Sequence, residues 1–288
     1  MNLGVLFAFG ALFGWAFGDF SIQRAVRAVG NVRALFYIGI LGSVALLPFA
    51  WNGIVPAFRD VTNYPLILFA CALVLVTALA NFQGLKLGKL SVVMPINGLE
   101  LVAAVGLAML IAHERYTAST YASIILVVVG LMLTTVTSFR NIKRMRWEKG
   151  VAWAIVGAIG LGTSNFTLGL ASRTFSPIFT IWLTHTAVAI GTAIIMFRRG
   201  SFACIRNDLK RHFNVITAQS LLDNLAWISY GYAATLIPIG IATTISEGYL
   251  VLATLLGVAV NKERLKRHQI LGVAITIIGI LVLSWVTA

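Results

Sequence analysis

The sequence has few charged residues, and this shortage decides its class. Only 11% of the 288 residues are charged, and 9 of them are Asp or Glu. A soluble domain usually carries charge on about a quarter of its residues. By contrast, 59% of the residues are hydrophobic, with a mean hydropathy of +0.92. We therefore expect an all-α integral membrane protein, because almost no polar surface is available to face water.

Cysteine and catalytic motifs are also scarce. The two cysteines, Cys71 and Cys204, have neither metal-binding nor redox spacing, so we predict no disulfide. The sequence contains no HExxH, GxSxG, Walker A or CxxC pattern. We predict that the protein is not an enzyme and holds no metal or cofactor. With no nucleotide site, any pumping must draw on ion or substrate gradients.

Long apolar runs fill the chain. A helix needs about 20 apolar residues to cross the bilayer, and ten such runs with short connections use up the length. Pro65 and Pro177 suit first helical turns, whereas Asn52, Gly53 and Pro56 predict a loop. No cleavable signal peptide is expected, because the first run begins without a basic segment. The predicted spans are 3–21, 34–51, 65–84, 91–112, 117–138, 150–170, 177–197, 213–234, 239–260 and 269–287.

The basic residues predict the orientation. The net charge of +13 comes from 22 Lys and Arg residues, of which the odd-numbered connections hold 19 and the even-numbered ones 3. Basic connections stay in the cytoplasm, so both termini are predicted outside the cytoplasmic membrane. This distribution argues against nucleic-acid binding and leaves the lipid bilayer as the partner of the basic segments.

The two halves of the chain resemble each other. Gly14 and Asp19-Phe20 recur 146 positions later as Gly160 and Asn165-Phe166, and Glu114-Arg115 recurs 149 positions later as Glu263-Arg264. Five spans are an odd number, so the second copy must be inverted in the membrane. We predict two inverted five-helix repeats around a central cavity. The predicted divisions are 1–138 for the first repeat, 139–149 for a basic cytoplasmic linker and 150–288 for the second repeat.

These motifs resemble the drug/metabolite transporter superfamily, in its ten-helix form built from two EamA units. The resemblance is carried by Gly14-Trp15 with Asp19-Phe20, by their counterparts from Gly160 to Phe166, and by the span endings His113-Glu114-Arg115 and Lys262-Glu263-Arg264. Pro95 also fits, although its counterpart is Thr244. The resemblance implies a central cavity lined by the first, third, fourth, sixth, eighth and ninth spans. It also implies cytoplasmic termini; here we follow the charge count instead.

Four carboxylates lie within predicted spans: Asp19, Glu100, Asp223 and Glu247. Ionisable groups inside a membrane are costly and mark functional sites by default. Each could instead serve only as an interhelical hydrogen-bonding group. Glu247, Asp223 and Glu100 are the candidates whose protonation state tunes transport. For Glu247, the hydroxyls of Thr243 and Thr244 one turn earlier are expected as hydrogen-bond donors.

Further side chains share helical faces with these carboxylates. Trp15 lies one turn before Asp19, and Trp227 and Tyr230 follow Asp223 on one stripe. Their aromatic faces could bind a substrate ammonium group, whereas Trp182, Tyr232 and Tyr249 are expected to pack. His185 is expected to be structural. The Gly10, Gly14 and Gly18 ridge is expected to let another helix approach closely. The predicted substrate-binding residues are Trp15, Asp19, Asn81, Asn97, Glu100, Asn165, Asp223, Trp227, Tyr230 and Glu247.

Together these features predict a monomeric secondary transporter that moves small polar metabolites by alternating access. Carboxylates and aromatics suit an ammonium-bearing substrate, and amino acids, with export favoured, come first through the family resemblance. A proton-coupled carrier of organic cations or amines is the alternative within transport. A lipid flippase or membrane scaffold is the alternative of another class.

Overall fold

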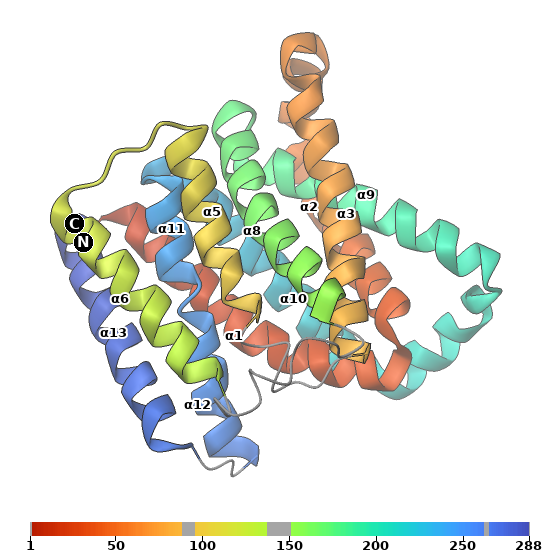
Figure 1. Ribbon diagram of the computed structural model, residues 1–288. Coiled ribbons are helices and arrows are strands. Elements are labelled where there is room, and N and C mark those ends of the chain that lie inside the picture. The colour runs from red at the N-terminus through yellow and green to blue at the C-terminus, as the bar shows by residue number, and fades with distance from the viewer. Residues whose placement is uncertain (1, 88–95, 137–150, 262–264, 288) are drawn as a thin grey trace.

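The computed structural model describes residues 2–87, 96–136, 151–261 and 265–287, and the regular elements of these ranges are all helices (Figure 1). The predicted linker 139–149, Pro95 and Glu263 lie outside the described residues. The first half contains α1 (Leu3–Val29), α2 (Asn31–Arg59), the short η1 (Val61–Asn63), α3 (Tyr64–Leu87), α5 (Leu99–Leu110) and α6 (Ala118–Thr135). The second half contains α8 (Val151–Thr174), α9 (Pro177–Arg198), η3 (Ser201–Cys204), α10 (Ile205–Leu236), α11 (Ile239–Ser246), α12 (Tyr249–Asn261) and α13 (Arg267–Thr287).

The described α-helices belong to the ten predicted spans, with α11 and α12 sharing the ninth, whereas η1 and η3 lie in connections. Within the residues that the structure describes, eight spans are long and apolar enough to cross a membrane, judged by length and composition. The remaining two are α5, which covers only the described part of the fourth span, and α10, which is rich in polar side chains. The polarity of α10 has a physical reason, because Gln219, Ser220 and Asn224 are buried inside the bundle and do not face lipid.

Polar residues at helix starts explain several boundaries. The Asn2 side chain accepts a hydrogen bond from the Gly4 N–H at 2.9 Å, and Thr117 and Ser176 cap α6 and α9 in the same way. Pro177 occupies the first turn of α9, as predicted. Gly30 separates α1 from α2 with a φ of 86°, a conformation that suits glycine.

The sequence prediction of the second loop is wrong. Asn52, Gly53 and Pro56 lie inside α2, which continues to Arg59. A Cβ at Gly53 would lie 3.1 Å from the Phe179 side chain, so this glycine allows α2 to pack closely on α9 and has no role in a turn. Tertiary packing has overridden the local helix-breaking signal.

The helix packing repeats when the two halves are exchanged. α1, the first helix of the first half, packs along α10, the third long helix of the second half. In the same way α8, the first helix of the second half, packs along α3 of the first half. The remaining principal pairs, α2 with α9 and α6 with α13, join equivalent helices of the two halves. This exchange is the packing expected of two inverted five-helix repeats. The termini meet on one side of the membrane, where the Asn2 side chain donates to the Thr287 carbonyl oxygen at 3.2 Å. We call this the terminal side.

Small residues hold the two long helix pairs close together. A Cβ at Gly14 would lie 2.7 Å from the Ala226 Cβ, and Gly10 faces Ser229. The equivalent position in the second half, Gly160, faces Thr77 of α3. The predicted glycine ridge of α1 is therefore a packing surface against α10.

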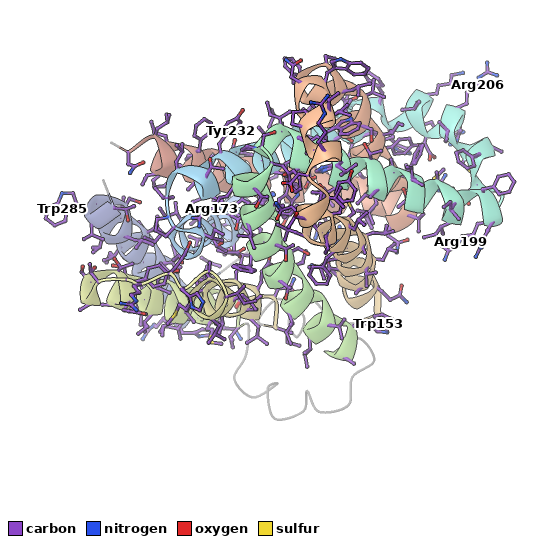
Figure 2. The ribbon with its side chains drawn as sticks, turned by 90° about the horizontal axis from the view of Figure 1, so that it is seen from above. Trp153, Arg173, Arg199, Arg206, Tyr232 and Trp285 are labelled. Atoms are coloured by element: carbon purple, nitrogen blue, oxygen red, sulfur yellow. The ribbon has the colours of Figure 1, made fainter. Side chains whose placement is uncertain are left out.

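The outer surface is apolar and the interior contains polar groups. Phe197 and Trp285 have exposed fractions of 79% and 80%. Figure 2 shows Trp153 and Trp285 pointing away from the helix bundle, and Arg199 and Arg206 at the far end of the α9–α10 hairpin. Buried Thr, Asn, Gln and Glu side chains occupy the interior instead. This distribution fits lipid outside and buried polar groups inside.

Candidate functional site

One amide side chain joins two buried carboxyl groups at the centre of the bundle. The Nδ2 of Asn165 in α8 donates to the Glu100 Oε1 at 3.0 Å and to the Glu247 Oε1 at 3.3 Å. The exposed fractions are 1% for Asn165, 6% for Glu100 and 1% for Glu247. We call these residues the central triad. Its members come from α8, the start of α5 and the α11–α12 break, so only the folded bundle brings them together.

Breaks in two spans position the carboxylates of the central triad. α11 ends at Ser246 and α12 begins at Tyr249, so Glu247 lies in the turn between them. In the first half a turn at Gly98 precedes α5, and Glu100 lies in the first turn of that helix. Breaks at corresponding places in two repeats are typical of transporter binding sites.

The central triad leaves two buried acceptors without partners. Among the described residues, neither the Asn165 Oδ1 nor the Glu247 Oε2 has a hydrogen-bond partner. A buried polar atom without a partner costs about 1–3 kcal/mol, so such an atom calls for an explanation. Both are acceptors, and a ligand with several N–H or O–H donors would satisfy them together.

The expected hydroxyl donors to Glu247 do not bind it. The Thr243 Oγ1 donates to the Ile239 carbonyl oxygen at 2.8 Å, and the Thr244 Oγ1 donates to the Gly240 carbonyl oxygen. Each hydroxyl bonds to the carbonyl four residues earlier, as hydroxyls in apolar helices often do. The donor to Glu247 is instead Asn165, from the other side of the interior.

An aromatic cluster adjoins the central triad. The Trp15 ring lies 4.9 Å from that of Trp227, 5.5 Å from Tyr230 and 5.9 Å from Tyr249, measured between centroids. The Tyr230 hydroxyl donates to the Asn165 backbone carbonyl oxygen at 2.9 Å, which ties the cluster to the triad. Trp15, Trp227 and Tyr230 thus meet at one place. Tyr249 belongs to the same cluster, although the sequence indicated only packing for it.

The other two carboxylates within the spans are more accessible. Asp19 is exposed and lies in the half of α1 away from the terminal side, one turn beyond Trp15. It is close enough to Glu100, Glu247 and Asp223 for the carboxylate charges to repel one another. Asp223 is half-buried, and its Oδ2 lies 3.5 Å from the His185 Nε2. Accessibility thus falls from Asp19 towards the central triad.

The remaining asparagines are placed differently. Asn97 is buried beside the Gly98 turn, close in sequence to Glu100. Asn81 is half-buried in α3, where its backbone packs against Gly157 of α8. Two of the residues expected to pack make such contacts: the Trp182 Nε1 donates to the Ser43 carbonyl oxygen at 3.0 Å, and Tyr232 stacks on Phe7. Within the described part of the chain, no group of three His, Cys, Asp or Glu side chains could hold a metal ion.

A second polar network lies on the terminal side. The Glu114 carboxylate accepts from the backbone N–H groups of Ile239 at 2.6 Å and Gly240 at 3.0 Å, and so caps the N-terminus of α11. Arg173 of α8 pairs with Glu114 at 3.2 Å and donates to the Ala234 carbonyl oxygen in α10. These bonds fasten α8, α10 and α11 to the connection after α5.

Tyr116 completes this network. Its hydroxyl donates to the Glu114 Oε2 at 2.7 Å. Burial, together with that hydrogen bond, raises the pKa of Tyr116 well above its ordinary value, so the phenol stays a donor. The sequence placed Glu114 at a helix end and gave no sign that it caps a different helix.

On the opposite side, an ion pair anchors the long α10. Arg33 of α2 pairs with Asp208 at 2.9 Å, and the Tyr37 hydroxyl donates to the same carboxylate at 3.0 Å. α10 begins eight residues before the predicted span, and its backbone is non-helical at His212, between this extension and the membrane-crossing part.

Both cysteines are free, as predicted, with Cys71 half-buried and Cys204 exposed.

Comparisons with known proteins agree with this architecture. The model of the EamA-like transporter family matches the chain twice, over residues 2–136 and 148–285. A solved structure titled only "Crystal structure of protein" superposes with a TM-score of 0.77, covering 99% of each chain at 13% sequence identity. At that identity the likeness shows the fold alone. A search of curated proteins finds no match.

Proposed function

Because the chain belongs to the EamA-like transporter family, we propose that it is a secondary transporter of small metabolites bearing an ammonium group. Amino acids are the first class to test, with export as the direction. The proposed transport is alternating access between the two inverted halves, by a monomer in the cytoplasmic membrane whose termini lie outside. Membership of a transporter family also supports the expectation that the chain is not an enzyme.

The central triad is the observation that carries this proposal. Glu247 offers an unpaired carboxylate oxygen and Asn165 an unpaired carbonyl oxygen, both fully enclosed by the bundle. An ammonium group has several donors and a positive charge, so it would satisfy both atoms and offset the carboxylate charge. The neighbouring rings of Trp15 and Trp227 provide faces that attract a cation.

Proton coupling would follow from the same carboxylates. Glu100 and Glu247 share one amide donor, so two full negative charges would repel each other in a medium of low dielectric. A proton on either group relieves this repulsion when no substrate is bound, and an ammonium group can take its place. Asp223, which lies near Asp19, is a third candidate for such exchange. Protons and substrate would then compete for one site.

Organic amines are the alternative substrates within transport. Each Lys or Arg side chain that the structure describes lies near a helix end or in a connection, away from the central triad. The described interior therefore offers carboxylates for an ammonium group but no Lys or Arg side chain for a substrate carboxylate, and its histidine, His185, already faces Asp223. This observation favours an amine over a zwitterionic amino acid.

A lipid flippase is the alternative of another class, and one feature favours it. An apolar hollow lies between α1, α12 and α13, lined by Leu12, Gly248 and Val251 among others, beside the exposed Phe13. Gly248 adjoins Glu247, so the hollow borders the ninth-span break. A lipid chain could enter there from the membrane.

The test is uptake into proteoliposomes of purified protein, with and without a pH gradient. Matched pairs of an amino acid and the amine that lacks only its α-carboxylate separate the two substrate classes, and a labelled phospholipid tests for flipping in the same vesicles. We expect uptake of at least one ammonium-bearing solute and loss of that uptake in Asn165→Ala. Asn63→Ala, in the short η1 after α2, makes the same change away from the central triad and is the matched control. Lipid movement without solute uptake would contradict the proposal.

A further inference from the structure

His185 lies where α9 meets α10, and both of its ring nitrogens face oxygen atoms. The Nδ1 lies 2.9 Å from the Ile181 carbonyl oxygen one turn earlier. The Nε2 lies 3.5 Å from the Asp223 Oδ2. The side chains of His185 and Asp223 are only 7% and 13% exposed, within the membrane-crossing part of the bundle.

The carbonyl contact fixes which nitrogen carries a hydrogen. A carbonyl oxygen can only accept, so the His185 Nδ1 must be the donor. In a neutral imidazole the other nitrogen then has no hydrogen and presents a lone pair. That lone pair faces Asp223, whose ionised carboxylate is also only an acceptor. Two acceptors face to face repel each other, most strongly where little water is present.

The contact becomes favourable when one further proton lies between the two side chains. The proton can reside on the His185 Nε2, giving an imidazolium beside a carboxylate, or on Asp223, giving a neutral pair. In both cases the pair holds one proton more than a neutral histidine and an ionised aspartate. We infer that His185 and Asp223 form a proton-binding site in this conformation, separate from the central triad.

The surroundings of the pair contain few other charges. From α2, the side facing His185 consists of Gly39 and Gly42, which have no titratable side chain. From α1, Gly18 packs against the Asp223 backbone, so the neighbouring Asp19 brings a further carboxylate, and no cation, to this region. The next residue of α10, Asn224, adds an amide whose Oδ1 is buried without a partner among the described residues.

The other helices packed against α9 do not compensate the pair. In α3, the titratable side chain that the structure describes inside the membrane is the Cys71 thiol. In α8 it is Arg173, which is paired with Glu114. Among the described groups of this region, the extra proton is therefore the positive charge that offsets the negative charge of the Asp223 carboxylate.

The position of the site gives it a role in coupling. His185 belongs to the α2–α9 pair and Asp223 to the α1–α10 pair, so the proton bridges two packed units. If alternating access moves one unit relative to the other, the two side chains separate and the proton loses its shared site. This consequence rests on the proposed function, whereas proton binding itself does not. It assigns to His185 a role that the sequence did not indicate.

The test is magnetic resonance of the full-length protein in lipid, with isotope-labelled histidine and aspartate at neutral pH. His185→Gln and Asp223→Asn each identify one signal by its loss, so either variant suffices if the other does not fold. We expect the His185 Nδ1 to carry hydrogen, and either the Nε2 or Asp223 to be protonated as well. A neutral His185 with hydrogen on the Nε2, or one with hydrogen on the Nδ1 beside an ionised Asp223, would overturn the inference.

His212→Gln is the matched control for the histidine variant, because His212 lies on α10 but at the kink outside the membrane-crossing part. This change should leave the His185 and Asp223 signals in place. In Asp223→Asn, the signal of a His185 imidazolium should be lost, since the carboxylate that stabilises it is gone. These measurements use no transported solute, so their failure would not be confused with failure of the proposed substrate class.

Discussion

Glu247→Gln is the substitution that separates binding from folding most cleanly. The Glu247 Oε1 accepts from the Asn165 Nδ2 at 3.3 Å, and glutamine keeps an oxygen able to do the same. The Glu247 Oε2, which has no partner among the described residues, is replaced by an NH₂ group. The variant therefore keeps the bond that holds the central triad but presents a donor where a substrate ammonium needs an acceptor.

The expected loss follows from the hydrogen bond removed. A hydrogen bond to a charged group contributes about 1.5–3 kcal/mol. Since about 1.4 kcal/mol is a factor of ten in affinity, the dissociation constant should rise roughly 10- to 100-fold. The thermal unfolding midpoint should stay close to that of the wild type, because buried packing and the Asn165 bond are retained. The solute identified by the uptake screen provides the ligand for a binding titration.

Asp60→Asn is the matched control, since it makes the same chemical change in the connection after α2, where Asp60 accepts from Asn63. It should bind substrate with wild-type affinity. An unchanged dissociation constant in a folded Glu247→Gln protein would refute the reasoning, because it would mean that the unpaired oxygen does not meet the substrate.

Further predictions address orientation, aromatic contacts, the terminal network and proton coupling. A C-terminal reporter that works only outside the cytoplasm should be active, because the odd-numbered connections hold 19 basic residues and the even-numbered ones 3; activity of a cytoplasmic reporter alone would reverse the topology. Trp227→Ala should weaken substrate binding while the lipid-facing Trp285→Ala does not, and equal affinities would assign Trp227 to packing. Glu114→Gln should destabilise the fold by about 1–3 kcal/mol, measured as a lower unfolding temperature, and an unchanged temperature would contradict the capping role. Substrate affinity should rise with pH as protons leave the site, and amide variants of Asp223, Glu100 or both should flatten that dependence; wild-type profiles in all of them would make these carboxylates structural.

Much of the fold could be predicted because membrane constraints act locally on the sequence. Apolar runs of sufficient length mark spans whatever their neighbours are. The Gly14 and Gly160 correspondence indicated the inverted halves, since both positions serve the same close approach of a long helix pair. Boundaries were less predictable. Gly53 and Pro56 lie within α2 because contact with α9 outweighs the local turn signal.

The candidate site could be predicted only in part. Intramembrane carboxylates such as Glu100 and Glu247 are recognisable from their cost in lipid. Their joint hydrogen bonding to Asn165 depends on which faces of separate helices converge, and no sequence spacing encodes that. The place of Tyr249 beside Trp15 could not be predicted for the same reason, because that contact crosses between the two halves.

His185 shows a different limit of sequence reasoning. A lone histidine in an apolar span is usually a satisfied structural residue, and its partner Asp223 is 38 positions away. Only the folded bundle shows that one ring nitrogen meets a carbonyl oxygen and the other a carboxylate. A regular polar stripe on α10 predicted that Asp223 faces inward, but gave no indication of the element that it faces.

The most direct test of the central claim is an experimental structure of the protein in lipid with its transported solute bound. The account predicts that the ammonium nitrogen of the solute lies within hydrogen-bond distance of both the Asn165 Oδ1 and the Glu247 Oε2, against the rings of Trp15 and Trp227. A solute bound elsewhere in the bundle, with those two oxygens still unpaired or occupied only by water, would contradict it.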